Sequence, residues 1–578
     1  MIRDYFRVLL VDLETGKGRI ERVEGRDTHA GGSGLAALLF ERFGIVDRLW
    51  DDPEQPFILA IGPLTGFFPL MSKTICAFKS PYHNQFAESH AGGRSALALR
   101  FADLDALVVV GRANVLSCLV LGSKRLEVRD VAFMRGMDVS STGKIFRRMF
   151  PGAGHRSILR IGPAGERLAA TACINVDSYR HFGRLGAGAV LGAKNLKGIF
   201  IHGDGIGNLP DQKGYSKLYQ RVYRQLTSTD MMKKYHNLGT PENIGVLNEL
   251  KALPIRNLQK TSDVEVKGIT GERFAEETLM RNQACSGCPI GCIHLGYVRE
   301  QFMKDNRYFF IQVPYDHEPI FAVGAMLGVN SAFKVLGLID AVERAGLDVM
   351  STGVALAWAT EAFAEGILSE EETLIGLRFG DAEAYKQAVY HMGRGTNPFY
   401  RLLSDGIMHA VRIYGGGDYA CVLGQEMAGY ATGEVFLTGQ ALGFRHSHLD
   451  TGGYTYDQQN QEKNAADAVD FLVEDEQNRV LLTSMAACLF ARKVYQPELL
   501  AECLESLGYA KLARNIGSVA ASVQRLRWNI RLATGYEPHR IDIPKRFLET
   551  VNWKGAIDAS YLDNLKSEYS RRILQFKG

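Results

Sequence analysis

The sequence predicts an α+β protein in which an N-terminal β-sheet-rich domain is followed by two mostly α-helical domains. The first observation is that short apolar runs broken by glycine, such as FILAIG and RSILRIG, recur up to about residue 208, as expected of strands. The second is that longer runs with helical periodicity, such as SAFKVLGLIDAVERAG, dominate afterwards. The segment GDGIGNLPDQKG at 203–214 is a plausible linker, so we place the first domain at 1–208.

The glycine cluster YGGGDY divides the remaining chain near residue 415, giving expected helical domains at 209–415 and 416–578. At the start of the chain, apolar runs flank the turn residues Glu14 to Gly16, which predicts a strand, a turn and a second strand. Ser369 with Glu372 forms a capping-box pattern, which predicts a helix start.

Composition excludes several classes of protein. The 578 residues are 46% hydrophobic and 23% charged, as in ordinary globular proteins, and the net charge of +3 is too small for a dedicated nucleic-acid or membrane-surface binder. No apolar run approaches the roughly 18 residues of a membrane span. The N-terminus lacks the pattern of a signal peptide. We therefore expect a cytoplasmic protein with neither nucleic acid nor a membrane span among its partners.

The nine cysteines are odd in number, and disulfides do not persist in a reducing compartment. Three of them form a C-x2-C-x3-C loop in NQACSGCPIGCIHLG, at Cys285, Cys288 and Cys292. Five others stand alone in apolar stretches and are expected to be core residues. These are Cys76, Cys118, Cys173, Cys421 and Cys503.

The cysteine loop brings three thiolates to one side of a tight turn, which suits a cubane iron–sulfur cluster with a fourth ligand from elsewhere. Zinc is the alternative metal, although zinc sites usually pair two such knuckles, and a loop without metal is the third possibility. The two spacings between the cysteines, x2 and then x3, occur in the reverse order in radical-forming iron–sulfur clusters, which argues against that class. Cys488, in LLTSMAACLFARKVY, is the best candidate for the fourth ligand because its small neighbours permit close approach.

Three glycine-rich segments are suited to negatively charged groups, because glycine leaves backbone N–H groups free ahead of a helix. In HAGGRSALALRF, Gly92 and Gly93 precede an amphipathic run, and in GRLGAGAVLGAKNLKGIF, Arg184 is placed to contact phosphate oxygens. In AGLDVMSTG, Gly346 is expected to end one helix and Ser351 or Thr352 to begin the next. Together they indicate a large, phosphate-bearing redox cofactor.

A dinucleotide site is the competing interpretation, because Gly186, Gly188 and Gly192 give G-x-G-x-x-x-G. Such a motif should follow a hydrophobic strand. The preceding residues, INVDSYRHFGR, are polar instead, which disfavours this interpretation.

These motifs, taken together, resemble those of the aldehyde ferredoxin oxidoreductase family, whose members carry tungsten with two pterins beside a cubane cluster. The resemblance extends over nearly the whole chain, and the cysteine loop with GRLGAGAVLGAKNLK is its most specific part. The matching stretches are IGPLTG (61–66), KSP (79–81), IGPAGE (161–166), GRLGAGAVLGAKNLK (183–197), CSGCPIGC (285–292), GLDVMSTG (346–353), ACLF (487–490) and PKRFLE (544–549).

The resemblance implies that the N-terminal domain is the base for a tungsten (or molybdenum) bis-pterin, with magnesium bridging the pterin phosphates. It implies a [4Fe-4S] cluster on Cys285, Cys288, Cys292 and Cys488. The positions that match cofactor contacts of the family are Lys73, where an arginine is usual, His90, Gly92, Arg184, Leu185, Glu343, Leu347, Asp348 and Leu489. The first pterin motif has glutamate for aspartate at Glu343, and the second, from Thr483 to Cys488, lacks its acid and glycine.

The catalytic region departs from the family pattern as well. Glu318 falls on the family's active-site glutamate, while His317 stands where a tyrosine is usual. A family histidine falls on Gln440, so that His446 or His448 is expected to supply the imidazole. The alternatives are a structural carboxylate at Glu318 and ordinary histidines at the other two positions.

The resemblance implies two-electron oxidation of an aldehyde to a carboxylic acid, with electrons leaving through the cluster to a ferredoxin or a ferredoxin-like iron–sulfur subunit. The alternatives are another redox reaction of the superfamily, such as reduction of an aromatic thioester, or a non-catalytic electron-relay subunit. The family's metal motif between subunits is absent from KVLGLIDAVERA, so dimerisation through iron is not expected, although a homo-oligomer of another kind stays open.

Overall fold

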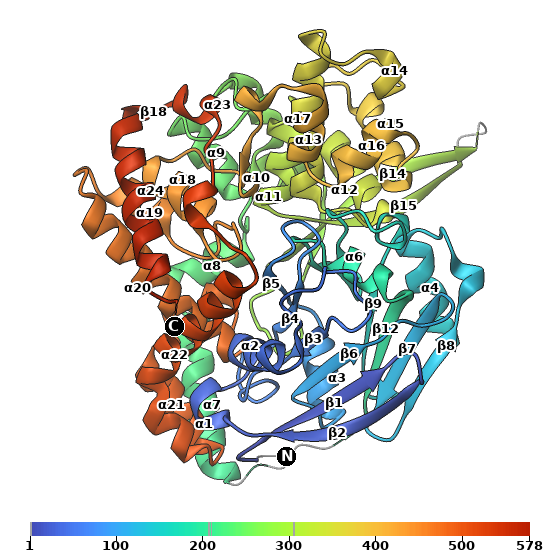
Figure 1. The fold of residues 1–578 in the computed structure, drawn as a ribbon, viewed down its shortest axis with the longest axis vertical. Coiled ribbons are helices and arrows are strands. Elements are labelled where there is room, and N and C mark those ends of the chain that lie inside the picture. Colours follow the sequence, from blue (N-terminus) through green and yellow to red (C-terminus); the bar gives the residue numbers. More distant parts are fainter. Residues whose placement is uncertain (1–2, 206–208, 210, 304–306, 578) are drawn as a thin grey trace.

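A computed structural model describes residues 3–205, 209, 211–303 and 307–577. Two β-sheets form the lower part of the molecule in Figure 1, and helices cover them above and on the left. The sheet-rich N-terminal region and the helix-rich remainder confirm the predicted fold class.

The first sheet has the strand order β2-β1-β6-β3-β4-β5. β1 and β6 are parallel and the other neighbours are antiparallel. The predicted hairpin at the N-terminus is confirmed, since β1 and β2 pair across the glycine turn. The strands are β1 (Phe6–Asp12), β2 (Lys17–Val23), β3 (Phe57–Ala60), β4 (Thr74–Lys79), β5 (Phe86–Ala91) and β6 (Ala106–Val110).

The second sheet has the order β11-β10-β9-β12-β7-β8. One hydrophobic core joins the two sheets, because it contains Leu59 and Leu107 of the first and Leu119 and Ile199 of the second. Two helices that follow glycine motifs, α3 (Ser95–Phe101) and α6 (Ala187–Ala193), also contribute to it. The strands are β7 (Ser117–Gly122), β8 (Leu126–Asp130), β9 (His155–Arg160), β10 (Ile174–Val176), β11 (Arg180–Phe182) and β12 (Leu196–Gly203).

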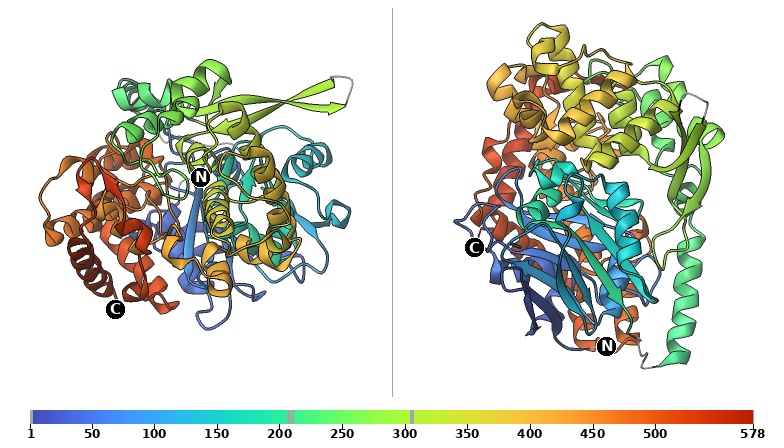
Figure 2. Two further views of the ribbon diagram at one scale, coloured as in Figure 1. Left: turned by 90° about the horizontal axis from the view of Figure 1, so that it is seen from above. Right: turned by 90° about the vertical axis from the view of Figure 1, so that its right-hand side faces the viewer.

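The expected linker at 203–214 falls partly outside the described residues, and α7 (Gln212–Thr227) begins within it. The right-hand view of Figure 2 shows α7 on the outside of the molecule. Helices α12 to α17 form the upper layer in Figure 1. The helices of the first two regions are α1 (Arg26–His29), α2 (Gly32–Phe43), α4 (Val139–Met149), α5 (Pro163–Glu166), α8 (Asp230–His236), α9 (Glu242–Glu249), α10 (Gly271–Glu277), α11 (His317–Ile320), α12 (Ala332–Ala345), α13 (Val349–Ala364), α14 (Glu370–Thr373), α15 (Ala382–Arg394), α16 (Pro398–Ser404) and α17 (Ile407–Tyr414).

Three local predictions in this region have different outcomes. The capping box of Ser369 and Glu372 is present at the start of α14. Gly346 ends α12 in the left-handed conformation, with φ of 76°, as expected. The start of α13 was expected at Ser351 or Thr352, and this is wrong: Asp348 caps the helix by accepting from two backbone N–H groups. Asp ranks among the best N-cap residues, so its carboxylate replaces the hydroxyl.

The region after residue 208 is mostly helical, as expected, but the segment around the cysteine loop is a sheet that the sequence patterns did not predict. There β13 (Leu279–Gln283), β14 (Ile293–Met303) and β15 (Arg307–Tyr315) form a three-stranded antiparallel sheet. The β14–β15 hairpin projects from the body of the molecule (Figure 2). The cysteine loop connects β13 to β14, and Glu318 follows directly after β15, so one sheet positions both.

The C-terminal region is mostly helical, as predicted, and covers the first sheet. Arg527 on its longest helix, α22, forms a buried ion pair with Glu88 on β5, at 2.9 Å. Among the described residues, no helix combines the length and apolar character needed to cross a membrane. The helices are α18 (Glu434–Leu442), α19 (Gly453–Gln459), α20 (Ala465–Ser484), α21 (Pro497–Ser506), α22 (Ala510–Ala533), α23 (Lys545–Leu548) and α24 (Ala559–Leu574), with short strand pairs β16 (Val422–Leu423) with β17 (Gln425–Glu426) and β18 (Val551–Asn552) with β19 (Gly555–Ala556).

Candidate active site

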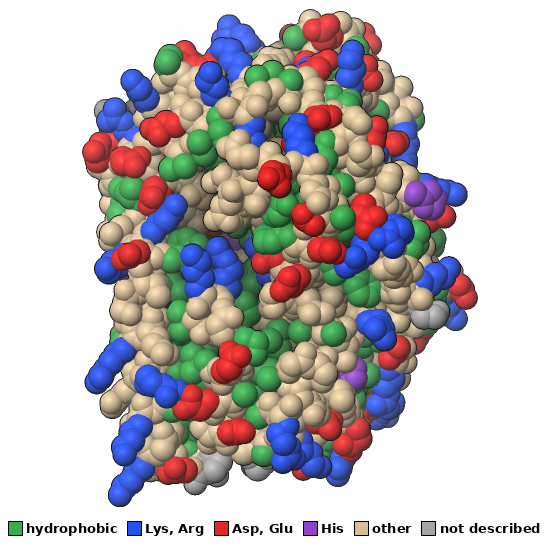
Figure 3. Space-filling model, turned by 90° about the vertical axis from the view of Figure 1, so that its left-hand side faces the viewer, with side chains coloured by type: hydrophobic (Ala, Val, Ile, Leu, Met, Phe, Trp, Pro, Cys, Tyr) green, Lys and Arg blue, Asp and Glu red, His purple; other side chains and the backbone are tan. Residues whose placement is uncertain are grey.

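A cavity of about 900 Å³ lies where the N-terminal sheets meet the helical regions. Its lining includes Cys285, Cys288, Cys292 and Cys488, together with Glu318. Figure 3 shows one face of the molecule, in which hydrophobic side chains gather in a hollow bordered by Lys and Arg. The fold therefore places all four predicted cluster cysteines and the predicted catalytic carboxylate around one space.

The fourth cysteine reaches the loop through close backbone packing. Its N–H donates to the carbonyl of Leu70 at 2.9 Å. Gly62, in the IGPLTG motif, lies so close to the preceding turn that a Cβ there would be 2.0 Å from the Met485 carbonyl oxygen. Glycine is thus required at 62 for Cys488 to approach from a segment almost 200 residues after Cys292 in the sequence.

The electrostatic surroundings favour thiolates unequally. Burial raises the pKa of Cys285, but the charges of Arg180 and Lys73 outweigh it, so the net pKa is lowered. Burial raises the pKa of Cys288 to about 12 and that of Cys292 to about 11, with the neighbouring cysteines contributing in the same direction. Four clustered sulfurs in a desolvated space are stabilised as thiolates when they bind a cationic metal group.

The donor set fits a group wider than one metal ion. Within the described residues, no three His, Cys, Asp or Glu side chains are close enough together to hold a single ion. All four cysteines nevertheless line the same cavity. Four thiols around one large cavity suit a cubane cluster, whereas zinc sites usually pair two cysteine knuckles. Gly92 is part of this fit, because a Cβ there would lie 2.6 Å from the Cys285 sulfur.

Arg184 also lines the cavity and is positioned by three groups. It donates to the Glu426 carbonyl at 2.7 Å, and its other contacts are Asp348 at 3.3 Å and Ser351 at 3.4 Å. Its Nη1 is buried without a hydrogen-bond partner. A buried guanidinium with an unused donor is suited to an anion such as phosphate.

The other predicted cofactor residues lie around the same cavity. Leu185 has a positive φ of 67°, and its carbonyl accepts from Ser80 at 2.8 Å. His90 contacts Glu88 at 3.0 Å, while burial and the Arg445 charge lower its pKa to about 4, so its ring is neutral at pH 7. The cavity lining also contains Lys73, His90, Leu185, Glu343, Leu347, Asp348 and Leu489.

Glu318 and His448 form an ion pair in the cavity wall. His448 Nε2 lies 2.9 Å from the Glu318 carboxylate, and the Tyr430 hydroxyl donates to the same oxygen at 3.4 Å. Burial alone raises the pKa of Glu318, but the His448 charge and hydrogen bond lower it to about 2. The carboxylate is therefore ionised at neutral pH. His448 Nδ1 is buried without a partner.

Three further predicted catalytic residues lie outside the cavity lining. His317 is fully buried, with Nε2 at 3.2 Å from the Gly429 carbonyl. His446 contacts Arg531 at 2.6 Å and the Ala441 carbonyl at 2.7 Å. Gln440 accepts from the Ala428 N–H and reaches the Glu426 carbonyl. Of the two histidines proposed to supply the imidazole, the structure brings His448 to the carboxylate and directs His446 to the protein interior.

The sequence patterns did not reveal several residues of the lining. Arg180 donates to the Cys292 sulfur at 3.7 Å, although its segment was read only as polar. Asp316, two residues before Glu318, has its pKa raised to about 7 by burial and by the Glu318 charge. Tyr430, Arg445 and Cys173 also line the cavity. The sequence did contain one indication for Arg180: it is a basic residue shortly before the glycine motif that begins at Gly183.

A buried space that joins four thiols to an anion site and an ionised carboxylate is typical of an oxidoreductase with an iron–sulfur group beside a large cofactor. Models of the aldehyde ferredoxin oxidoreductase family match almost the whole chain, the N-terminal domain over residues 8–203 and domains 2 and 3 over 217–572. The chain therefore belongs to the aldehyde ferredoxin oxidoreductase family. This membership implies a tungsten bis-pterin cofactor and iron–sulfur chemistry.

Relatives support this assignment over most of the chain. The tungsten-containing aldehyde ferredoxin oxidoreductase of Pyrococcus furiosus is 27% identical over 577 residues, which cover 95% of this chain and 92% of that protein. The protein of the same name from Thermococcus kodakarensis is 30% identical over a stretch that covers 67% of this chain and 62% of that protein. A third relative is the "aliphatic sulfonate oxidoreductase, WOR-like subunit" of Pyrococcus furiosus. It is 26% identical over a stretch that covers 66% of this chain and 63% of that protein.

The fold also resembles a solved structure. The active site complex BamBC of benzoyl coenzyme A reductase, in complex with 1,5 dienoyl-CoA, matches with a TM-score of 0.79 over 99% of this chain and 95% of that chain. The identity is 18%, so the likeness concerns the fold.

Proposed function

We propose that this protein oxidises an aldehyde to a carboxylic acid and passes two electrons, one at a time, to a ferredoxin-type iron–sulfur acceptor. The observation that carries the proposal is the ion pair of Glu318 and His448 in the same cavity as four clustered cysteines. An aldehyde and a water molecule give a carboxylate, three protons and two electrons. The two electrons reduce two one-electron acceptors.

The cofactor proposed for the cavity is a tungsten (or molybdenum) bis-pterin whose phosphates are bridged by magnesium. When bound, this group supplies Lewis acidity toward the substrate oxygen and receives the electron pair. Arg184 binds a phosphate oxygen through its unused Nη1, and Asp348 and Ser351 hold the guanidinium in place. His90 is neutral, and its two ring nitrogens are held by Glu88 at 3.0 Å and Arg445 at 3.2 Å, which fixes the ring in the cavity lining.

Glu318 accepts the proton released when the oxygen nucleophile adds to the substrate carbonyl. Its carboxylate is ionised at neutral pH, which is the state that a general base requires. His448 keeps the carboxylate in that state and orients it through the 2.9 Å contact. The Tyr430 hydroxyl limits the rotation of the same carboxylate.

Cys285, Cys288, Cys292 and Cys488 would hold a [4Fe-4S] cluster, which would supply a one-electron exit from the cavity. Arg180 stabilises added negative charge on this group, because its guanidinium donates to the Cys292 sulfur and lies near Cys285.

Metal analysis and turnover of anaerobically purified protein test the proposal together. We expect about four iron and about one tungsten or molybdenum per chain, with aldehyde-dependent reduction of benzyl viologen. Iron without tungsten or molybdenum, and no turnover, would instead support the electron-relay alternative. A metal-loaded enzyme that reduces an aromatic thioester and leaves aliphatic and aromatic aldehydes unchanged would replace the proposed substrate class.

A further inference from the structure

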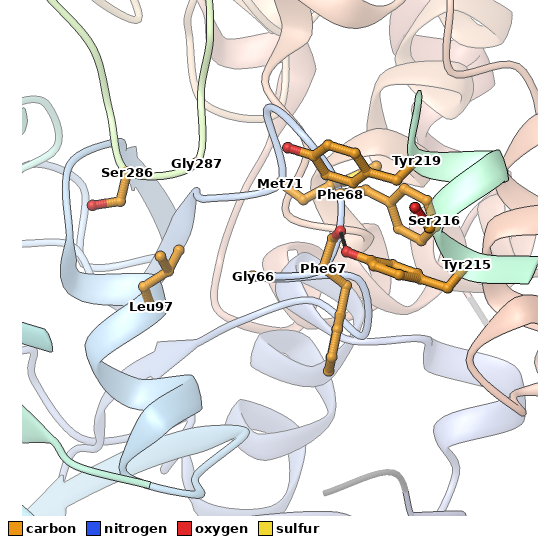
Figure 4. Close-up of a pocket in the computed structure, with 10 residues that line it drawn as sticks. All are labelled: Gly66, Phe67, Phe68, Met71, Leu97, Tyr215, Ser216, Tyr219, Ser286 and Gly287. Atoms are coloured by element: carbon orange, nitrogen blue, oxygen red, sulfur yellow. Dashed lines mark hydrogen bonds between the residues drawn. The ribbon is translucent and has the colours of Figure 1, made fainter. Parts of the chain in front are cut away.

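A second cavity, of about 360 Å³, lies beside the cysteine loop (Figure 4). Ser286 and Gly287, the two residues between Cys285 and Cys288, form one side of it. The opposite side consists of aromatic residues from the segment 66–71 and from α7. The cavity is distinct from the active-site cavity, whose lining contains the sulfur atoms themselves.

The aromatic side is a packed cluster of rings. The centroid of Phe68 lies 5.5 Å from that of Tyr215 and 6.5 Å from that of Tyr219. The Tyr215 hydroxyl donates to the Phe67 carbonyl, which fixes α7 against this segment. Cys288 packs against the same hydrophobic cluster as Phe68. Apolar side chains therefore connect the surface at this cavity with a cluster cysteine.

The cysteine loop reaches the surface at this place. Gly287 is exposed, and its carbonyl accepts from the Leu70 N–H at 3.3 Å. The Ser286 N–H donates to the Gly93 carbonyl at 3.1 Å. These bonds hold the loop against two other segments of the chain, so the loop is a fixed contact surface.

The segments around the second cavity carry only positive charge. Residues 66–71, 92–101, 212–227 and 285–291 contain no Asp or Glu, in a chain with nearly equal numbers of acidic and basic residues. Their basic residues are Arg94, Arg100, Lys213, Lys217, Arg221 and Arg224.

Five of these six basic side chains are exposed. Arg100 is held internally by the Gly62 carbonyl and Asp105. Arg221 forms an ion pair with Glu502 on α21. Arg94 lies next to Gly93, which contacts the cysteine loop, while Lys213 and Lys217 lie one turn apart on α7. Exposed positive charge is thus carried by two segments that contribute lining residues, 92–101 and α7.

We infer that this surface, with Gly287 near its centre and α7 at its edge, is the docking site of an acidic iron–sulfur electron carrier. The inference rests on the proposed function, since it names where the acceptor binds. An aromatic patch bordered by cations favours a partner with an apolar contact surrounded by carboxylates. In each encounter the carrier gains one electron and the bound cluster loses one, so two encounters follow each aldehyde.

The test is a charge reversal on α7 that leaves the active-site cavity unchanged. In the holoenzyme, Lys213→Glu with Lys217→Glu reverses two exposed charges on α7, the helix that contributes Tyr215 and Tyr219 to the second cavity. The matched control is Arg378→Glu with Arg412→Glu, which changes the same charge in the upper helical layer, far from α7 (Figure 1). The probe is a purified acidic 2[4Fe-4S] ferredoxin, and each enzyme is assayed with ferredoxin and with benzyl viologen.

We expect the α7 variant to lose on the order of tenfold in kcat/KM for ferredoxin at low salt, because electrostatic steering of this kind changes association rates by 10 to 10³. Viologen-linked turnover and metal content should match those of the parent enzyme. The difference from the control should disappear at high ionic strength. The neutral pair Lys213→Gln and Lys217→Gln should give an intermediate loss, and it substitutes for the charge reversal if that variant misfolds.

Unchanged ferredoxin kinetics in a metal-loaded α7 variant, or an equal loss in the control, would overturn the docking site. Failure of the proposed function is distinguishable, because the wild-type enzyme would then fail to reduce viologen with aldehyde. In that case the dissociation constant of ferredoxin for the holoenzyme, measured directly, still tests the surface: equal affinity of the wild type and the α7 variant contradicts it.

Discussion

The cavity contains two groups of residues with opposite chemistry. Around the cysteines, Arg180 and Lys73 place positive charge beside sulfur, which favours the retention of electrons. Around Glu318, the His448 imidazole keeps a carboxylate ionised, which favours the acceptance of a proton. Asp316 is affected by both, since the Glu318 charge raises its pKa while Arg180 and Lys73 lower it. The comparison teaches that one cavity contains a positively charged environment around its thiols and an ionised carboxylate at a separate place, and the proposed function assigns electrons to the first and the proton to the second.

The largest expected effect comes from removing a cluster ligand. Cys488→Ala deletes the thiol that joins the C-terminal region to the loop, so the cluster should be lost and aldehyde-dependent viologen reduction with it. Iron content and the iron–sulfur absorption measure this loss. The control is Cys503→Ala, which removes a buried cysteine of the hydrophobic core and should retain iron. A Cys488→Ala enzyme with full iron content would show that the fourth ligand is another residue.

The second effect concerns the proton acceptor alone. Glu318→Gln keeps the shape of the side chain but removes the base, so kcat should fall by about 10² to 10⁴ while iron and tungsten or molybdenum contents stay unchanged. His317→Gln, at the neighbouring position outside the cavity lining, should have a much smaller effect. Steady-state kinetics with benzyl viologen distinguish the two. Full turnover in the metal-loaded Glu318→Gln enzyme would exclude this residue as the base.

A smaller effect, visible mainly in the pH profile, is expected for His448→Gln. His448 holds the pKa of Glu318 at about 2 against the effect of burial, so its removal should raise that pKa. A larger fraction of the carboxylate is then protonated at mildly acidic pH. The acid limb of kcat/KM should therefore move to higher pH than in the parent enzyme. His446→Gln changes a histidine directed away from the cavity, and an equal shift in that variant would contradict the assignment of His448.

The smallest effect on turnover is expected from substitution of Arg180. This substitution should mainly change the reduction potential of the iron–sulfur cluster. Arg180→Gln removes a cation and a donor to the Cys292 sulfur, which stabilise the more negative, reduced cluster. The reduction potential of the cluster should become more negative, and Arg180→Lys should retain part of the parent value. A redox titration followed by electron paramagnetic resonance measures the shift. A potential that is unchanged in Arg180→Gln would separate this residue from the cluster.

Much of the fold follows from local sequence patterns. The N-terminal hairpin, the helices after the glycine motifs and the capping box of Ser369 are local features, and the structure contains all three. The sheet at 279–315 was missed, because its strands form around the cysteine loop and depend on antiparallel partners rather than on a single periodic run. The N-cap at Asp348 was missed because three residues in this stretch are suitable caps.

The site was predictable only in part, for a similar reason. The cysteine spacing and the family motifs identified residues that line the cavity, including Glu318 and Arg184. The choice between His446 and His448 depends on a loop without periodicity, where His446 adopts a positive φ of 50° and turns inward. The contact of Arg180 with sulfur depends on how β11 lies against the cysteine loop, and no local pattern encodes that arrangement.

The position of Cys488 also has a consequence for biosynthesis. The three thiols of the loop lie at residues 285–292, and Cys488 is synthesised almost 200 residues later. A maturation factor that inserted iron and sulfur during translation would therefore meet an incomplete ligand shell. Insertion of a group bound by all four thiols would therefore have to follow the synthesis of Cys488.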